Sequence, residues 1–287
     1  MNSPRDIRRR IRSISGTAQI TRAMQMVAAS KMRKAQQAAL AARPFAQLLY
    51  RIQRSATKRA YQFGHPLLEV RAVRRTAVIL IAGDKGLCGA LNTNVFRLAA
   101  QFDPQSTVYI AAGRKAAQFV ARTRRHLAAE FAYGDSPAFP EARAIAAFAR
   151  DLFLRGEVDR VQIVATRFVN TLTQVPVCIE YLPVGAIQSL RLPGLDEEDL
   201  AADAEDALFE PDAASVLEYL LGHYLNIYVY FVLLNAKASE QSARMVSMKN
   251  ATDSAEGLID ALTLEYNKLR QGNITKELLE IAGGQAG

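Results

Sequence analysis

The fold of this chain is decided by a segment near its N-terminus, TRAMQMVAASKMRKAQQAALAARPF (residues 21–45), which holds five basic residues and no acidic one. Small or apolar residues recur through it and beside it at alternating steps of three and four, the spacing of a coiled-coil seam. The seam positions are Ile7, Ile11, Ile14, Ala18, Ala28, Met32, Ala35, Ala39, Ala42, Ala46 and Leu49. Because many of them are alanine, the sequence predicts a long helix that a partner helix can approach closely.

Two long helices are predicted at the ends of the chain. The first begins at SPRD (residues 3–6), where a serine cap, a first-turn proline and a carboxylate three residues after the cap occur together. It runs to about Lys58, and Pro44 should weaken it because proline removes a backbone hydrogen bond. The second follows Pro211, since apolar positions continue to Ile281 without another proline. Neither helix can bury its apolar stripe alone, so we expect the two to pair antiparallel.

Charge is distributed unevenly along the chain. The formal net charge is +8, yet the residues up to Pro66 contain 14 basic residues and one acid, giving +13 for this arm and −5 for the remainder. A local excess of this kind predicts an acidic partner. The arm also contains Met24, Met26, Val27 and Met32, which offer an adaptable apolar surface. An acidic protein would use both properties, whereas nucleic acid would use only the charge, so no nucleic-acid partner is expected.

The middle of the chain predicts a mixed α/β domain with a mainly parallel sheet. Apolar, β-branched runs predict strands at residues 75–83, 107–113, 159–170 and 174–184, and helical patterns between the first three occupy residues 93–102, 114–124 and 141–155. Only three residues separate the last two strands, which predicts an antiparallel hairpin at an edge. The expected division is an N-terminal helix at 1–60, the α/β domain at 70–200 and a C-terminal helix at 208–287.

Candidate catalytic and ligand-binding patterns are weak. The loop GDKGLCGALN (residues 83–92) follows a strand, but its GxxGxxG spacing fits neither the dinucleotide fingerprint nor a P-loop, so a tight turn is the favoured interpretation. His65, His126 and His223 lie in separate segments without ligand or triad spacing. Two cysteines suit neither a disulfide framework nor a zinc site. We expect no catalytic residue, no cofactor and no metal.

The N-terminal stretch and the longest apolar run bear on targeting and membrane insertion. The basic stretch at the N-terminus is not followed by a continuous apolar core, which argues against a signal peptide. A transit peptide remains a minor alternative, because the segment is arginine-rich and acid-poor. The longest apolar run, residues 227–234, is far shorter than the roughly 20 residues that cross a bilayer. No membrane span is therefore expected.

Six sequence blocks, spread in order over nearly the whole chain, resemble the gamma subunit of F-type ATP synthase. They are ITRAMQMVAASKMRKAQ, DKGLCGALN, FVNTLTQVP, FEPD, EQSARMVSMKNATD and YNKLRQGNITKELLEIAGG. Departures are small: Gly83 stands where the family often has Ser or Thr, Ser254 where Asn is usual, and Gln285 where Ala is preferred. The resemblance implies a long antiparallel coiled coil of the terminal helices and a central Rossmann-like α/β domain.

The resemblance also implies a role and partners. Such a subunit is the non-catalytic central stalk that rotates inside a head of three alpha and three beta subunits, and it couples proton flow to ATP synthesis or hydrolysis on beta. Its other partners are the epsilon subunit and the ring of c subunits. By the same resemblance the beta contacts are Met24, Arg33, Lys34, Arg270, Gln271, Thr275 and Glu277, and the foot toward the c ring and epsilon contains Phe209 and Glu210. The expected location is the cytoplasmic side of a bacterial inner membrane, bound only through the complex.

Overall fold

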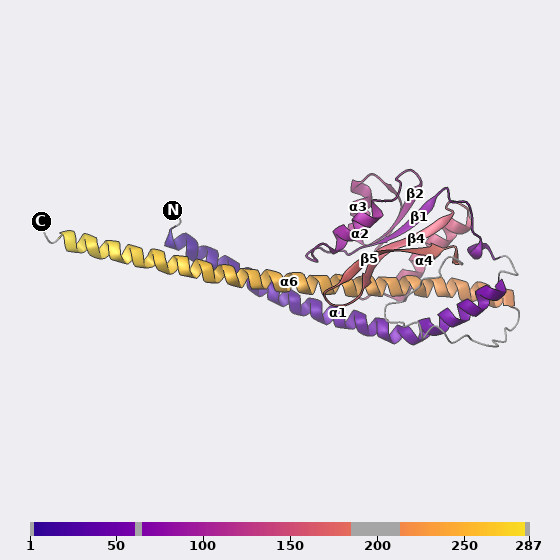
Figure 1. Ribbon diagram of the computed structural model, residues 1–287, viewed down its shortest axis with the longest axis horizontal. Coiled ribbons are helices and arrows are strands. Elements are labelled where there is room, and N and C mark those ends of the chain that lie inside the picture. Colours follow the sequence, from indigo (N-terminus) through magenta and orange to yellow (C-terminus); the bar gives the residue numbers. More distant parts are fainter. Residues whose placement is uncertain (1–2, 61–64, 185–212, 285–287) are drawn as a thin grey trace. The chain divides into compact units, whose positions relative to one another are not determined.

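The computed structural model describes residues 3–60, 65–184 and 213–284 (Figure 1). The elements are α1 (Pro4–Ala60), η1 (Pro66–Leu68), β1 (Thr76–Ile81), α2 (Leu91–Ala99), β2 (Thr107–Ala112), α3 (Arg114–Arg122), β3 (His126–Phe131), α4 (Phe139–Leu154), β4 (Arg160–Phe168), β5 (Gln174–Leu182) and α6 (Ala213–Gly284). The chain forms two compact units: a helix-pair unit of residues 1–28 with 244–287, and a sheet unit of residues 29–243.

Helix α1 begins where its sequence signal predicts. The Ser3 hydroxyl donates to Asp6 Oδ2 at 2.8 Å, and the Asp6 backbone N–H donates to Ser3 Oγ at 3.3 Å. The second bond gives the Ser3 oxygen the role of a helix cap, because it accepts a backbone N–H of the first turn, and the first bond links the two side chains. The hydrogen bond from Ser3 also holds the pKa of Asp6 below its usual value. The backbone then remains helical through Pro44 as far as Ala60, close to the predicted end at Lys58.

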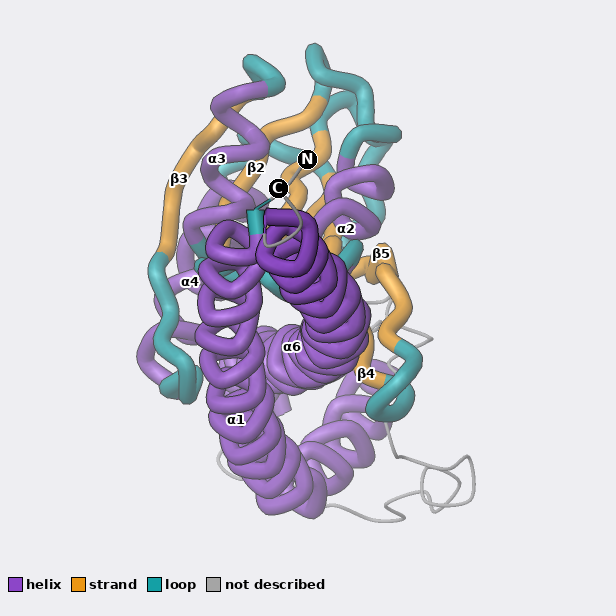
Figure 2. The backbone as a smooth tube through the Cα atoms, turned by 90° about the vertical axis from the view of Figure 1, so that its left-hand side faces the viewer, coloured by secondary structure: helices purple, strands orange, loops and turns teal. Residues whose placement is uncertain are grey.

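In the helix-pair unit α1 and α6 run antiparallel, as predicted (Figure 2). Arg8 lies over the Tyr266 ring, 5.9 Å from its centroid, and the Thr21 hydroxyl lies 2.7 Å from that of Thr252. As residue numbers increase along α1, the residues opposite on α6 have decreasing numbers, which is the register of an antiparallel pair. The buried side chains follow steps of three and four on both helices: Ile7, Ala18, Thr21 and Ala28 on α1, and Met248, Thr252, Ala255 and Leu262 on α6. The heptad spacing in the sequence therefore becomes a two-helix coiled-coil seam.

The sheet unit contains a five-stranded sheet with the order β3-β2-β1-β4-β5. Strand β1 pairs parallel with β2 and β4, and β2 pairs parallel with β3. Strand β5 pairs antiparallel with β4 and forms an edge, which confirms the predicted hairpin. The four parallel strands have the order β3-β2-β1-β4, which is also found in Rossmann folds. In this order the chain adds β2 and β3 on one side of β1 and then adds β4 on the other side. The predicted α/β architecture with a mainly parallel sheet is therefore confirmed.

The sequence patterns do not predict strand β3. Its sequence, HLAAEF, is poor in β-branched residues and includes a histidine and a glutamate. It forms the other edge of the sheet, where every side chain is half-buried or exposed. An edge strand does not need the apolar run that marks a buried parallel strand. The pairing partner β2, rather than local propensity, determines this strand.

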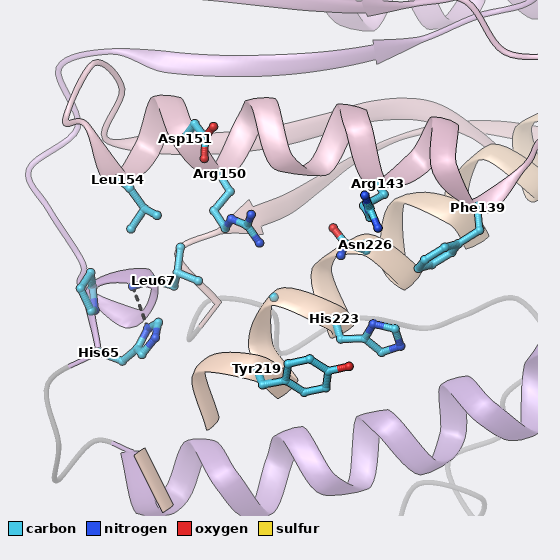
Figure 3. Close-up of a pocket in the computed structure, with 12 residues that line it drawn as sticks. His65, Leu67, Phe139, Arg143, Arg150, Asp151, Leu154, Tyr219, His223 and Asn226 are labelled. Carbon is cyan, nitrogen blue, oxygen red and sulfur yellow. Dashed lines mark hydrogen bonds between the residues drawn. The ribbon is translucent and has the colours of Figure 1, made fainter. Parts of the chain in front are cut away.

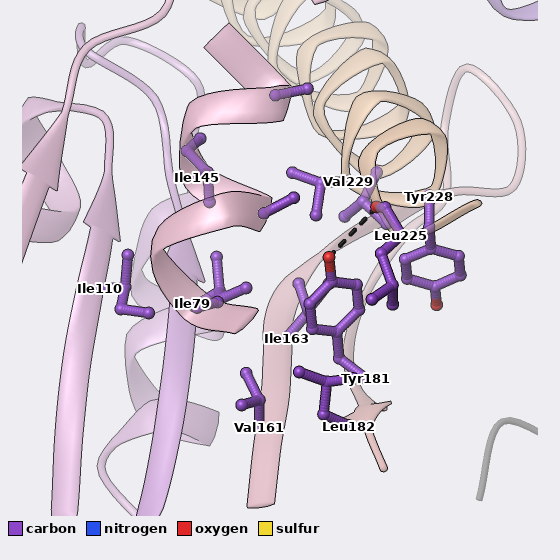
Figure 4. Packing of buried hydrophobic residues seen from close by; sticks show 14 of the residues in the cluster. Ile79, Ile110, Ile145, Val161, Ile163, Tyr181, Leu182, Leu225, Tyr228 and Val229 are labelled. Atoms are coloured by element: carbon purple, nitrogen blue, oxygen red, sulfur yellow. Dashed lines mark hydrogen bonds between the residues drawn. The ribbon is translucent and has the colours of Figure 1, made fainter. Parts of the chain in front are cut away.

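The two faces of the sheet have separate cores. Alternate residues of β1 point in opposite directions. Ala77, Ile79 and Ile81 pack on α4 and on the first half of α6. Val78 and Leu80, on the opposite face, pack on α2 and α3. In the first core the Tyr181 hydroxyl donates to the Leu225 carbonyl of α6 at 3.2 Å (Figure 4). The buried residues in the first half of α6 thus belong to the sheet unit. There α6 and α4 pack against one face of the sheet, as in an α/β sandwich.

Candidate interaction surfaces

The helix-pair unit presents an exposed apolar strip on α1. Ile20 and Val27 are 62% and 54% exposed, and they lie seven residues apart on one helical face. Thr21 and Ala28, one position further on, are buried against α6. Met24 lies between these two faces and is half-buried. Ile20 and Val27 therefore form a second apolar face of α1, bordered by Met24, and the α1–α6 pair does not use it.

A buried hydroxyl pair fixes the register of the helices beside this strip. The hydroxyls of Thr21 and Thr252 lie 2.7 Å apart, and Thr252 can also donate to the Met248 carbonyl at 2.9 Å. Arg22 forms an exposed ion pair with Glu256, which contributes at most about 1 kcal/mol. This register, with Thr21 opposite Thr252, places Met24 opposite the residues just after Met248.

The candidate residues near the C-terminus lie on one stretch of α6. Arg270, Gln271 and Thr275 are all exposed, and the Thr275 hydroxyl donates to the Gln271 carbonyl at 2.9 Å. Extending the α1–α6 register shows that α6 beyond Gln271 passes the first described residues of α1. This explains why Ile274, Leu278 and Leu279 are exposed. The side chain of Glu277 lies outside the described residues, and so do Phe209 and Glu210.

Arg33 and Lys34 lie in the sheet unit, on the part of α1 that follows residue 28. Both side chains are exposed, while the neighbouring Met32 and Ala35 are buried. Neither cation has an ion-pair partner within the described parts of the chain. The structure therefore places two adjacent free charges on an exposed helical face, where a carboxylate of another molecule can reach them.

A buried ionic cluster in the sheet unit joins three elements. Lys237 of α6 is 1% exposed, and its ammonium lies 3.0 Å from Glu240 Oε2 and 3.3 Å from Asp135 Oδ1. Lys31 of α1 donates to the other oxygen of Asp135 at 2.5 Å. The ammonium of Lys237 also lies 5.2 Å from the centroid of the Tyr133 ring, a cation–π contact. Asp135, from the loop after β3, is thereby held between two helices.

These contacts set the ionisation of the cluster. The hydrogen bond from Lys31, followed by the charge of Lys237, lowers the pKa of Asp135 to about 2. Burial raises the pKa of the Tyr133 hydroxyl well above its usual value, and that hydroxyl donates to the Ala82 carbonyl at 3.0 Å. Asp135 is therefore ionised at neutral pH, whereas Tyr133 is neutral. Residues 31, 135 and 237 are far apart in the chain, so no local sequence pattern predicts the cluster.

The glycine loop after β1 is a strand-to-helix turn occupied by a carboxylate of the same chain. A Cβ at position 83 would lie 2.8 Å from the carboxyl carbon of Glu240, so glycine at this position leaves room for the Glu240 carboxylate as it lies here. The Gly83 backbone N–H donates to Asn92 Oδ1 at 3.3 Å. A buried carboxylate at the start of the loop repels phosphate. This agrees with the interpretation of residues 83–92 as a structural turn.

Two of the three histidines line one pocket of the sheet unit. Their positions in the sequence did not predict this grouping. The pocket has a volume of about 870 Å³, and His65 and His223 reach it from η1 and α6 (Figure 3). His65 Nδ1 also accepts the Leu67 backbone N–H at 3.1 Å and so caps η1. Among the described residues there is no group of three metal-ligating side chains. Over the same residues, no helix is long and apolar enough to cross a bilayer.

Comparisons with known proteins agree with this geometry. The family model for ATP synthase matches residues 3–287. A protein of Opitutus terrae named ATP synthase gamma chain is 48% identical over 290 residues, and the match covers 99% of this chain and 98% of the relative. A protein of Methylacidiphilum infernorum with the same name is 43% identical over 293 residues, and the match covers 99% of both chains. The chain belongs to the ATP synthase gamma-chain family.

Solved structures give the same fold. A chain in the central stalk and c ring of the Tetrahymena thermophila mitochondrial ATP synthase has a TM-score of 0.60 and 26% identity, covering 81% of this chain and 99% of its own. One from the OSCP/F1/c-ring structure of the Euglena gracilis enzyme has a TM-score of 0.67 and 21% identity, covering 99% of this chain and 93% of its own. As a gamma chain the protein is a central-stalk subunit of ATP synthase, and the nucleotide chemistry belongs to the beta subunits.

Proposed function

We propose that the helix-pair unit is the shaft that turns inside a head of alpha and beta subunits and couples proton flow through a c ring to ATP synthesis or hydrolysis on beta. The observation that carries this proposal is the antiparallel pairing of α1 with α6, which leaves an apolar strip of α1 exposed. The seam supplies a shaft, and the outward residues supply a surface for a partner. The Tetrahymena structure contains the central stalk and the c ring, and the Euglena structure contains F1 and the c ring, which supports these partners.

The shaft can couple sites because its circumference is not uniform. One side of α1 near Ile20 is apolar, whereas Arg22 and Glu256 form a charged side. Three equivalent beta subunits around such a shaft would each meet a different surface, so their nucleotide affinities would differ at any moment. Turning the shaft would pass each affinity from one subunit to the next. Rotation needs no strong latch, and half-buried methionine and exposed lysine provide adaptable, modest contacts.

We assign the partner contacts as follows. Met24, Arg33 and Lys34 would meet acidic loops of beta, because the two cations are exposed and unpaired in the described chain and Met24 borders the apolar strip. Arg270, Gln271, Thr275 and Glu277 would contact beta near the end of α6, where that helix has passed α1. Phe209 and Glu210, outside the described residues, would belong to the foot toward epsilon and the c ring.

The proposed location is the cytoplasmic side of a bacterial inner membrane, as a peripheral subunit of the complex. Its bacterial relatives support this location. The chain itself would then reach the membrane only through the c ring. Isolation of the complex from detergent-solubilised membranes tests the location and the partners together. Recovery of this chain with alpha, beta, epsilon and c subunits is expected, whereas salt-sensitive retention on DNA without alpha and beta would contradict the proposal.

The beta contact is tested by Met24→Lys in the assembled enzyme. The new charge enters a half-buried site beside the apolar strip, so ATP-driven proton pumping by inverted membrane vesicles should fall while ATPase activity and subunit recovery remain. The matched control is Gln19→Lys, which adds the same charge at an exposed position of the same helix. Equal pumping by the Met24→Lys enzyme and the wild type would rule out a coupling contact at Met24.

A further inference from the structure

The pocket in the sheet unit is not explained by the stalk role. It lies between α4, η1 and the first described turns of α6, and its volume of about 870 Å³ falls within the range of small-molecule sites (Figure 3). Its lining is His65, Pro66, Leu67, Phe139, Arg143, Arg150, Asp151, Leu154, Tyr219, Gly222, His223 and Asn226. Charged, aromatic and amide side chains therefore converge on one cavity.

Two arginines of α4 supply positive charge to this pocket. Arg143 and Arg150 are seven residues apart, so they project from one face of the helix, and Figure 3 shows both pointing toward α6. Neither has an ion-pair partner in residues 3–60, 65–184 or 213–284. Asp151, the one acid among the described lining residues, offsets only one of them. The pocket thus retains a positive charge that an anion can neutralise.

Gly222 makes room for one of these guanidinium groups. A Cβ at position 222 would lie 3.1 Å from Arg150 Nη1, closer than an ordinary van der Waals contact. Glycine is disfavoured inside a helix, and Gly222 lies ten residues into the described part of α6. The missing side chain allows the guanidinium to lie against the helix and to keep its donors in the pocket. Position 222 therefore serves the placement of Arg150.

The opposite wall offers a flat aromatic surface and an unused acceptor. The rings of Tyr219 and His223 are stacked 6.1 Å apart at an interplanar angle of 6°, and the Phe139 ring lies 5.9 Å from that of His223. Tyr219 is 75% exposed, so its outer face is open. Asn226 Oδ1 is buried and accepts no hydrogen bond from the residues that the structure describes. A planar ring with an amino group fits both features.

We propose that this pocket binds a nucleotide-class ligand, meaning a planar heterocycle that carries one or more phosphates. The phosphates would accept hydrogen bonds from Arg143 and Arg150, whose forked donors suit phosphate geometry. The ring would stack on Tyr219, and a ring amino group would donate to Asn226 Oδ1. Binding involves no chemical step. The site is separate from the glycine loop at residues 83–92, and the inference does not depend on the stalk role.

The proposal is tested by calorimetric titration of the full chain, free of beta subunits that bind nucleotide themselves. ADP is the probe, and pyrophosphate and adenosine are its two halves. ADP should bind at least about tenfold more tightly than either half, because each half forms only part of the contacts. Arg143→Ser with Arg150→Ser should weaken ADP binding at least about tenfold. The matched control, Arg97→Ser with Arg122→Ser, removes two exposed arginines from α2 and α3 and should leave ADP binding unchanged.

A second variant separates position from charge. Gly222→Leu keeps every charge and suits a helix, but its side chain would occupy the place of the Arg150 guanidinium, so ADP binding should be lost while circular dichroism is unchanged. No binding of ADP at millimolar concentration would overturn the proposal. Equal binding by wild-type chain and the Arg143/Arg150 variant would also overturn it. Pyrophosphate binding as tight as ADP binding would overturn the assignment of a ring-bearing ligand.

Discussion

The buried ammonium of Lys237 gives the sharpest prediction for the stability of the sheet unit. Lys237→Met keeps the length of the side chain and removes its charge, which leaves the Glu240 carboxylate, 2% exposed, without the cation 3.0 Å away. Removing one partner of a buried ion pair costs about 3–5 kcal/mol. We expect the lower limit, about 3 kcal/mol, because the second acid, Asp135, is 43% exposed and keeps its bond to Lys31.

This cost can be measured by thermal unfolding of the full chain. An unfolding entropy of about 2.1 cal/mol/K per residue, applied to 287 residues, gives about 0.6 kcal/mol/K. A loss of about 3 kcal/mol therefore lowers the midpoint by about 5 °C, read by near-ultraviolet circular dichroism at neutral pH. Lys249→Met, at an exposed position of the same helix, is the control and should change the free energy of unfolding by less than about 0.5 kcal/mol.

A double variant distinguishes lost pairing from lost packing. Lys237→Met combined with Glu240→Gln removes both charges of the buried pair. Its loss of unfolding free energy should be smaller than the sum of the two single losses by at least about 1 kcal/mol. A Lys237→Met midpoint within about 1 °C of wild type would refute the reasoning, as would strictly additive losses, because either result would mean that the two groups do not interact.

Three further predictions concern other contacts. Thr21→Val should cost the helix-pair unit about 1–2 kcal/mol, because the Thr252 hydroxyl loses its buried partner; Thr21→Val with Thr252→Val should cost less than the two single losses together, measured by urea unfolding. Since the pKa of Asp135 is lowered to about 2 from 3.8, its stabilisation is complete above pH 4 and is lost as the pH falls toward 2. Screening at this half-exposed group reduces the effect to about 1 kcal/mol, and Asp135→Asn should remove that part of the pH dependence of unfolding. Burial raises the pKa of the Cys178 thiol to about 11 from 9.0, so alkylation by iodoacetamide at pH 8 should be about a hundredfold slower in the folded chain than in urea, followed by mass spectrometry; equal rates would contradict the raised pKa.

The sequence by itself determined the elements whose signals are local. The cap at Ser3 and Asp6 sets the start of α1, and heptad spacing sets the seam that pairs with α6. Apolar β-branched runs set the buried strands, and the short connection between β4 and β5 sets the antiparallel direction of β5. These features depend on residues within a turn or two of one another, so periodicity and propensity describe them. The family blocks, read in order, also identified the stalk role.

Tertiary structure alone decided the features that depend on contacts between distant residues. Strand β3 exists because β2 offers it an edge, and its own side chains carry little strand signal. Lys237 and Lys31 both meet Asp135 only after α6, α1 and the loop after β3 pack together, and His65 and His223 line one pocket only when η1 meets α6. The partner contacts proposed for Arg33 and Lys34 stay predictions, because the surface that would complete them belongs to another chain. Local patterns fix the geometry of a backbone segment, whereas charge pairing and pockets are set by where the folded segments meet.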